Sequence, residues 1–245
     1  MFGDMLKHQS FSKISGRFIK HIGKKYNNKI SAGEYIIERF IDKKIHIGYS
    51  YKQSNYTPFF NIANKFNNFH VVFNSHEPSI GFCALSYAKN TNNIGLILSS
   101  STYGFANICK SLKNSKYDNI PLLLMSFYDK ESESKLTKSL KPERQYIKEY
   151  HNINDINKLP NLLEYTMMLS ELYPKGSVHI NICNSILNKP VKFDDLILDK
   201  LNTKLLDEGS QSQNMLPDKE NLSLLQYYEE GYEECEKYEN FIHHK

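Results

Sequence analysis

Residues 74–95 read NSHEPSIGFCALSYAKNTNNIG, and a short apolar run, FHVVF, precedes them at residues 69–73. An apolar run rich in Val and Phe favours a β-strand. Pro78 suits the first turn of a helix, and apolar residues recur after it at helical spacing. The stretch is therefore predicted to be a strand, a turn and a helix over residues 78–89, with Glu77 at the turn.

Glu77 has two interpretations at this position. The first turn of a helix leaves backbone N–H groups without partners and carries a partial positive charge, so any carboxylate is stabilised there. The alternative is that Glu77 is the working acid of a functional site. Residues 74–95 alone do not separate the two, and the rest of the chain has to decide.

Strand-like and helix-like segments alternate on both sides of this stretch. Ser31 followed by Glu34 forms a capping-box signature at the start of the first helix. Continuous apolar strands separated by amphipathic helices indicate an α/β fold, with a parallel sheet sandwiched by helices. We predict strands at residues 45–49, 69–73, 94–100, 120–128 and 178–182, helices at residues 31–43, 58–66, 78–89, 106–115 and 159–172, and a polar loop at 129–145.

The composition is that of a globular chain. Its 245 residues are 40% hydrophobic and 13% aromatic, which is enough to bury the core of one sizeable domain. The formal net charge is only +4, and no nucleic-acid-binding motif is present, so nucleic acid is not expected as a partner. No apolar run approaches the roughly 18 residues of a membrane span. We expect a soluble, intracellular and cytoplasmic protein without a transmembrane segment.

The cysteines give no sign of a metal site. There are four, they are scattered, and they form neither a CxxC pair nor a group with histidines at ligand spacing. Neither a zinc site nor a disulfide framework is expected. They are Cys83, Cys109, Cys183 and Cys235.

Charge is concentrated at the two ends of the chain. Residues 1–29 are rich in lysine, and the apolar residues between the lysines permit an amphipathic helix. Asp4 and the scarcity of arginine argue against an organellar transit peptide. Residues 192–245 contain the linker-like GSQSQN and an acidic segment. We divide the chain into a basic extension at 1–29, one domain at 30–191, and a linker with an acidic tail at 192–245.

Several motifs in the predicted domain occur in a fixed order. Together they resemble the pyrimidine-binding, N-terminal domain of thiamine-diphosphate enzymes of the acetolactate synthase and pyruvate oxidase type. The closing segment GSVHINICNSILNKPV at 176–191 also resembles the end of that domain. The other motifs are His76-Glu77, Tyr87-Ala88-Lys89, Gly95, Gly104-Phe105-Ala106-Asn107 and Asp118-Asn119-Ile120-Pro121.

The resemblance implies a specific role for Glu77. In the family, this carboxyl group hydrogen-bonds a ring nitrogen of the cofactor's aminopyrimidine and favours the imino tautomer, which deprotonates the thiazolium carbon. That is general acid and base chemistry on a cofactor. The resemblance implies no metal ligand in this domain, and places the candidate cofactor contacts at the ends of strands. These contacts are Gly48, His76, Thr102, Tyr103, Gly104 and Asn107.

The chain departs from the family pattern at two loops. The family's F-G-x-P-G turn is replaced by IGYSY at residues 47–51, and its G-P-G loop by Thr102-Tyr103-Gly104. A glycine permits close approach of backbone to a ligand, and β-branched Thr102 hinders it. Nothing after residue 191 resembles the diphosphate-binding domain, so thiamine diphosphate and its Mg²⁺ would need a separate partner subunit, in a homo- or hetero-oligomer.

Two functions therefore stay open. The first is a thiamine diphosphate-binding protein in which Glu77 activates the aminopyrimidine, together with a separate diphosphate-binding chain. If active, that complex would be a lyase or transferase acting on 2-oxo acids. The alternative is a degenerate, non-catalytic interaction or structural protein that retains the fold.

Overall fold

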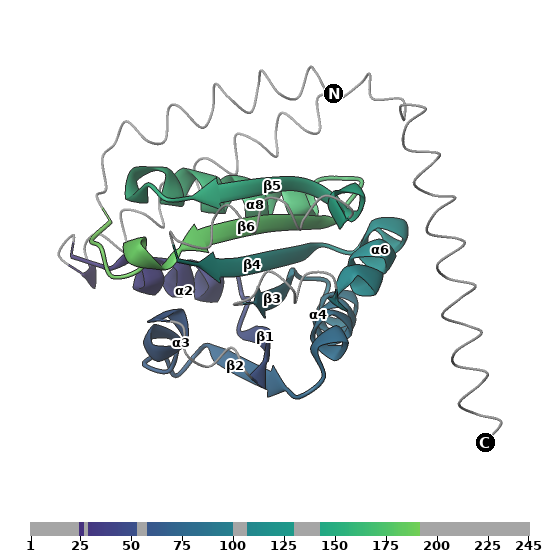
Figure 1. Ribbon diagram of the computed structural model, residues 1–245, viewed down its shortest axis with the longest axis horizontal. Helices are drawn as coiled ribbons and strands as arrows, with labels where there is room; N and C mark the ends of the chain where they lie inside the picture. The colour runs from purple at the N-terminus through teal and green to yellow at the C-terminus, as the bar shows by residue number, and fades with distance from the viewer. Residues whose placement is uncertain (1–24, 27–28, 53–57, 100–106, 130–142, 192–245) are drawn as a thin grey trace, which may run out of the picture. The chain divides into compact units, whose positions relative to one another are not determined.

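The fold is seen in a computed structural model that describes residues 25–26, 29–52, 58–99, 107–129 and 143–191 (Figure 1). Within them, a six-stranded sheet has the strand order β2-β1-β3-β4-β6-β5, and every adjacent pair of strands is parallel. The predicted α/β fold with a parallel sheet is confirmed. The terminal extensions predicted at 1–29 and 192–245 lie almost entirely outside the described residues.

The helices and strands have the following bounds. The strands are β1 (Ile47–Tyr51), β2 (His70–Asn74), β3 (Gly95–Ser99), β4 (Leu122–Tyr128), β5 (Ile147–Ile153) and β6 (Ser177–Cys183). The α-helices are α2 (Ala32–Asp42), α3 (Pro58–Ala63), α4 (Glu77–Thr91), α6 (Cys109–Asp118) and α8 (Leu159–Glu171). Short 3-10 turns are η3 (Glu143–Tyr146), η4 (Ile156–Lys158) and η5 (Asn184–Ile186).

Most predicted elements are found within three residues of these bounds, and two predictions need correction. The strand predicted at 45–49 lies two residues later, because Tyr51 continues the ladder opposite Asn74 of β2. Strand β5 was missed, because its sequence IKEYHNI is polar and its interior residues are only half-buried at the edge of the sheet. Edge strands do not need the continuous apolar run that marks a central strand.

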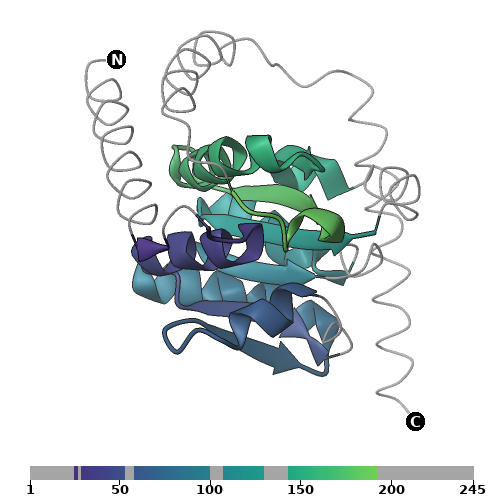
Figure 2. The same ribbon diagram turned by 90° about the vertical axis from the view of Figure 1, so that its left-hand side faces the viewer.

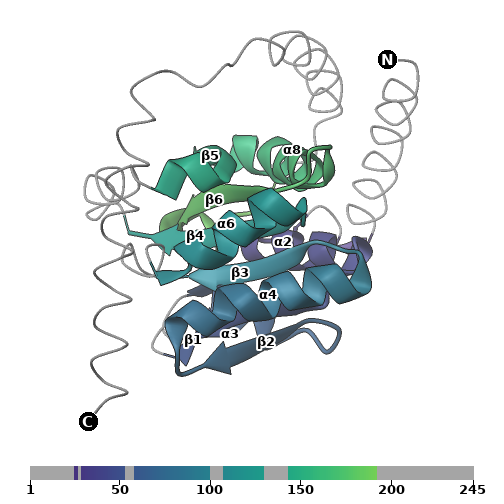
Figure 3. The same ribbon diagram turned by 90° about the vertical axis from the view of Figure 1, so that its right-hand side faces the viewer.

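Helices cover both faces of the sheet. Figure 3 shows α4 and α6 on one face, and Figure 2 shows α2 on the opposite face. The buried hydrophobic residues form two clusters, one on each face of the sheet. One buried cluster joins Ala84 of α4 and Leu112 of α6 to Ile97 of β3. The other joins residues of α2, α3 and α8 to alternate residues of the same strands, such as Leu98. Because successive side chains of a strand point to opposite faces of the sheet, each central strand contributes buried residues to both clusters.

Local sequence fixes the start of α2 and the close contact of α4 with the sheet. The predicted capping box is confirmed: the Ser31 hydroxyl accepts from the Glu34 N–H at 3.4 Å, and the Glu34 carboxylate accepts from the Ser31 N–H at 2.9 Å. At Gly95, a Cβ atom would stand 2.2 Å from the Ala84 carbonyl oxygen. Glycine at the start of β3 therefore permits α4 to lie directly against the sheet.

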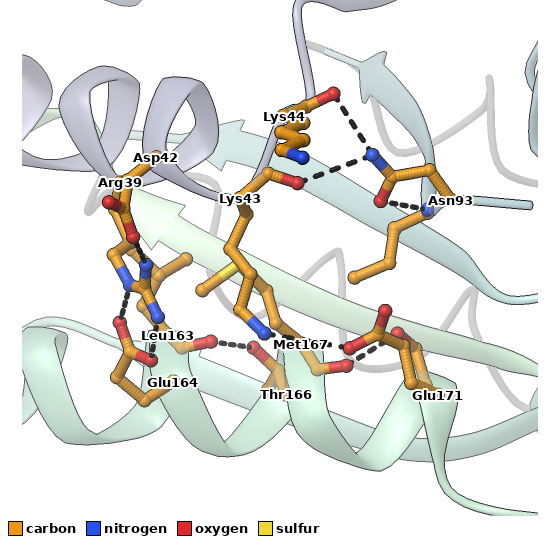
Figure 4. Close-up of polar contacts among 12 residues, drawn as sticks. Arg39, Asp42, Lys43, Lys44, Asn93, Leu163, Glu164, Thr166, Met167 and Glu171 are labelled. Carbon is orange, nitrogen blue, oxygen red and sulfur yellow. Dashed lines mark hydrogen bonds and ion pairs between the residues drawn. The ribbon is translucent and has the colours of Figure 1, made fainter. Parts of the chain in front are cut away.

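A buried ion pair joins α2 to α8 (Figure 4). The side chains of Arg39 and Glu164 are 0% and 1% exposed, Arg39 Nη2 donates to Glu164 Oε2 at 2.7 Å, and Arg39 Nε donates to Oε1. Arg39 Nη1 also donates to Asp42, which is 42% exposed. The geometry is bidentate, so the two charges compensate each other where water does not reach.

Removing one partner of this pair should destabilise the protein strongly. Glu164→Met leaves the Arg39 guanidinium buried beside an apolar side chain, and we expect the free energy of unfolding to fall by about 3–5 kcal/mol. Urea denaturation measures it. Glu171→Gln is the matched control, because its 3.6 Å ion pair with Lys43 is partly exposed and should cost less than about 1 kcal/mol.

The double variant Arg39→Met/Glu164→Met tests the electrostatic cause. It removes both buried charges and leaves Asp42 in contact with solvent, so it should be more stable than Glu164→Met alone. A double variant no more stable than the single one would show that packing, and not the unpaired charge, accounts for the loss.

Candidate functional site

The order of the strands defines a topological switch point at the carboxyl ends of β1 and β3. The connection that follows β1 contains α3, and the one that follows β3 contains α6, which lies on the opposite face of the sheet. Neighbouring parallel strands whose connections leave on opposite faces form a topological switch point, where α/β sheets bind ligands. A site is expected here from topology alone.

Glu77 and Asn107 meet at this switch point. Glu77 is the first residue of α4, directly after β2, and Asn107 lies between β3 and α6. Asn107 Nδ2 donates to Glu77 Oε2 at 2.8 Å. In the sheet, β1 lies between β2 and β3. The hydrogen bond therefore joins the two segments that flank the end of β1, and it brings together two residues predicted from the sequence.

His76 contributes to the turn that presents Glu77. Its ring Nδ1 lies 2.6 Å from the hydroxyl oxygen of Ser79, and its backbone N–H donates to the Asn74 side-chain oxygen at 2.9 Å. Both contacts stay within the link between β2 and α4. His76 thus has a structural role at the start of the helix, and its contact with a cofactor stays a prediction.

Gly48 does not lie where we expected it. The strand predicted at 45–49 would place Gly48 near a carboxyl end, but β1 begins at Ile47 and Gly48 is its second residue. A Cβ atom there would stand 2.6 Å from Leu98 Cδ1, in the core cluster on the face opposite α4. This contact explains the glycine by packing.

The residue at the carboxyl end of β1 is Tyr51. Its half-buried ring packs against the core cluster beneath α4 and α6, on the same face of the sheet as the helix that carries Glu77. An aromatic ring therefore stands at the switch point. Thr102, Tyr103 and Gly104, the other predicted contacts, lie outside the described residues.

A polar row crosses the same end of the sheet, and we did not identify it from the sequence. Ser126 of β4 is in register with Ser99 of β3 and with Asn181 of β6, and Asn181 is in register with Asn152 of β5. Ser99, Ser126 and Asn181 are buried. A signal exists in the sequence, since a polar residue stands near the carboxyl end of each of these strands.

His179 anchors this row. The single hydroxyl proton of Ser126 goes to Asn181 Oδ1 at 2.7 Å, so His179 Nε2, 2.6 Å from the same hydroxyl oxygen, must be the donor. The Tyr150 ring lies edge-on to the imidazole, with centroids 5.0 Å apart. Burial lowers the pKa of His179 from 6.5 to about 3, so the imidazole is neutral at physiological pH.

The described residues contain no group of three or more His, Cys, Asp or Glu side chains that could hold a metal ion. Within the same part of the chain, no helix is long and apolar enough to span a membrane.

Comparison with known proteins adds independent information. The model of one family, described as "Thiamine pyrophosphate enzyme, N-terminal TPP binding domain", matches residues 30–153, which is half of the chain. The X-ray structure of a proposed thiamin diphosphate-dependent enzyme from Mycobacterium smegmatis is similar, with a TM-score of 0.58 and 15% identity. The match covers 66% of this chain and 32% of that one. None of the curated proteins compared with the chain matched it.

Acidification should expose the contribution of His179. Between pH 6.5 and about 3 the unfolded chain binds a proton that the folded chain does not. The stability tied to neutral His179 is therefore complete above pH 6.5 and is lost as the pH falls toward 3, by about 1 kcal/mol for each pH unit. Denaturation curves from pH 7 to 4 measure it.

Two variants isolate this effect from other acid-sensitive groups. In His179→Gln the free energy of unfolding should depend less steeply on pH than in the wild type. The matched control is His70→Gln, which makes the same substitution at an exposed position of β2. Equal slopes for His179→Gln and the wild type would contradict the assignment.

Proposed function

The chain belongs to the family of thiamine pyrophosphate enzyme N-terminal domains, and from that premise we propose that it binds the aminopyrimidine of thiamine diphosphate at the β1–β3 switch point. The observation that carries the proposal is the 2.8 Å hydrogen bond from Asn107 to Glu77. It holds a carboxyl group at the switch point, where α/β sheets bind ligands. In this proposal Glu77 is the catalytic residue.

The residues at the switch point fit an aminopyrimidine. A carboxylate has two acceptor oxygens, and the Asn107 amide takes Oε2. Oε1 would then be the acceptor that Glu77 offers to the ring nitrogen of the ligand. Because an amide neither gains nor loses a proton at neutral pH, Asn107 orients the carboxyl group without acting as an acid or base itself. Glu77 thereby keeps the capacity to hold a proton against the ring nitrogen.

When bound, thiamine diphosphate supplies a thiazolium carbon that becomes nucleophilic once deprotonated. The chain's own residues act on the other ring. Glu77 shares a proton with the aminopyrimidine, Asn107 keeps the carboxyl group in place, and the buried face of α4 holds the start of the helix against the sheet. Tyr51 forms part of the floor beneath them.

The diphosphate and its Mg²⁺ are assigned in this proposal to a partner subunit. Mg²⁺ takes oxygen ligands from carboxylates and phosphates. No cluster of three acidic or other ligand side chains exists in the described part of the chain. Moreover, the chain spans about a third of the length of the similar X-ray structure. The complex would be a hetero-oligomeric lyase or transferase acting on 2-oxo acids, of the acetolactate synthase type.

A second candidate function rests on Tyr51. Strand β1 continues through Tyr51 where the family sequence has a glycine turn, so a half-buried ring stands where backbone would approach the ligand. If the ring fills the switch point, the protein is a non-catalytic interaction module that retains the fold. Tyr51→Ala separates the two functions, because it should gain affinity for the cofactor only if Tyr51 obstructs it.

Calorimetry on the full chain with thiamine diphosphate and Mg²⁺ tests the first function. We expect saturable, weak binding, since half of the cofactor has no partner groups, and Glu77→Gln should weaken it at least tenfold because a charged hydrogen-bond acceptor is lost. Glu171→Gln, on α8 at the other face, is the matched control and should bind as the wild type does.

The same titration is repeated with a diphosphate-domain chain added. Tighter binding with that chain, again dependent on Glu77, supports the hetero-oligomer. The first function is wrong if Glu77→Gln binds as tightly as the wild type. If the wild type does not bind the cofactor at millimolar concentration, either alone or with the diphosphate-domain chain added, the result favours the non-catalytic module.

A further inference from the structure

Helices α4 and α6 lie side by side on one face of the sheet (Figure 3), and at one point they are in unusually close contact. A Cβ atom placed on Gly81 of α4 would stand 2.0 Å from the hydroxyl oxygen of Ser111 and 2.9 Å from its Cβ. It would also stand 3.3 Å from Cβ of Ile108. Real Cβ atoms do not approach other atoms below 3.0 Å, so only a hydrogen atom fits at position 81.

On α4 this contact lies one turn from Glu77, because Gly81 follows Glu77 by four residues and residues four apart in a helix lie on the same face, about 6 Å from each other. On the other side, Ser111 lies in the first turn of α6, and Asn107 lies in the segment just before that helix. Both glycine and serine are buried, whereas the pair above them reaches solvent. The buried contact between Gly81 and Ser111 therefore lies beneath the exposed hydrogen bond between Asn107 and Glu77.

Ser111 connects the contact to the segment that carries Asn107. Its hydroxyl donates to the carbonyl oxygen of Ile108 at 2.6 Å, and its backbone N–H lies 3.0 Å from the same oxygen. Ile108 is the neighbour of Asn107 in the chain and is itself buried. Ser111 is thus hydrogen-bonded to the residue that directly follows Asn107.

We propose that the Gly81–Ser111 contact sets the distance between Glu77 and Asn107 and so makes Gly81 a positioning residue of the site. The importance of this contact for catalysis rests on the proposed function, whereas its effect on the distance between Glu77 and Asn107 does not. At 2.8 Å the hydrogen bond has little tolerance, because N–H···O bonds weaken beyond about 3.2 Å. A side chain at position 81 that separates the helices by about 1 Å would break it.

Three variants test the proposal. Gly81→Ala introduces the methyl group, and Gly81→Ala/Ser111→Gly adds it while removing the side chain that it would meet. Gly33→Ala is the matched control. It also adds a methyl group at a buried helical glycine, 2.5 Å from Ile62 Cδ1, but on α2 at the other face and against the flexible end of a side chain.

The readout is the NMR signal of the Asn107 side-chain amide, identified by its loss in Asn107→Ser. In the wild type this signal should shift when the carboxyl group of Glu77 titrates, and Glu77→Gln should abolish that response. Gly81→Ala should abolish it too, while the double variant and Gly33→Ala retain it. Cofactor affinity should fall at least tenfold in Gly81→Ala and recover to within about threefold in the double variant.

Failure of the inference and failure of the proposed function are distinguishable. The amide response needs no ligand, so it tests the positioning role even if the wild type does not bind thiamine diphosphate. A Gly81→Ala protein that folds and keeps the response overturns the inference. If Gly81→Ala does not fold, the double variant decides: a folded double variant with the response supports the inference, and one without the response overturns it.

Discussion

Helix α4 packs so closely between β3 and α6 that no Cβ atom fits at either contact. At one contact Gly95 faces the carbonyl oxygen of Ala84, and at the other Gly81 faces Ser111. Distances of 2.2 Å and 2.0 Å for a hypothetical Cβ leave α4 little freedom to slide or tilt. Because interiors are close-packed and respond to a single methyl group, these two glycines fix the helix that presents Glu77. The position of Glu77 at the site is therefore set by the packing of α4.

Polar side chains are also arranged in register at the carboxyl end of the sheet. Across β3, β4, β6 and β5 a polar row replaces the apolar side chains found lower in the strands, and neutral His179 is hydrogen-bonded beneath it. Buried polar groups that satisfy one another specify one arrangement, at the cost of their desolvation. The ion pair of Arg39 and Glu164 does the same for α2 and α8 on the other face. The polar row thus helps to fix the arrangement of the strand ends next to the switch point.

Sequence patterns predicted the parts of this arrangement that depend on local spacing. The alternation of elements and the capping box of Ser31 follow from periodicity and local motifs, and the family resemblance implied that Glu77 and Asn107 both belong to the site. Strand β5 was not predictable in that way, because its stability comes from pairing with β6 at the sheet edge. The position of Gly48 along β1, near its start and not at its carboxyl end, depended on a two-residue shift in the bounds of the strand. The contact of Gly81 with Ser111 depends on how two helices cross, which a single sequence does not encode locally.

The central claim is that the fold holds Glu77 and Asn107 at the switch point to receive an aminopyrimidine. The most direct measurement is an NMR titration of the full chain with 4-amino-5-hydroxymethyl-2-methylpyrimidine, which lacks the diphosphate and needs no partner subunit. The claim predicts saturable changes in the backbone signals of residues 77–81 and 107–111. Changes confined to residues of α2, α3 or α8, or none at millimolar ligand, would contradict it.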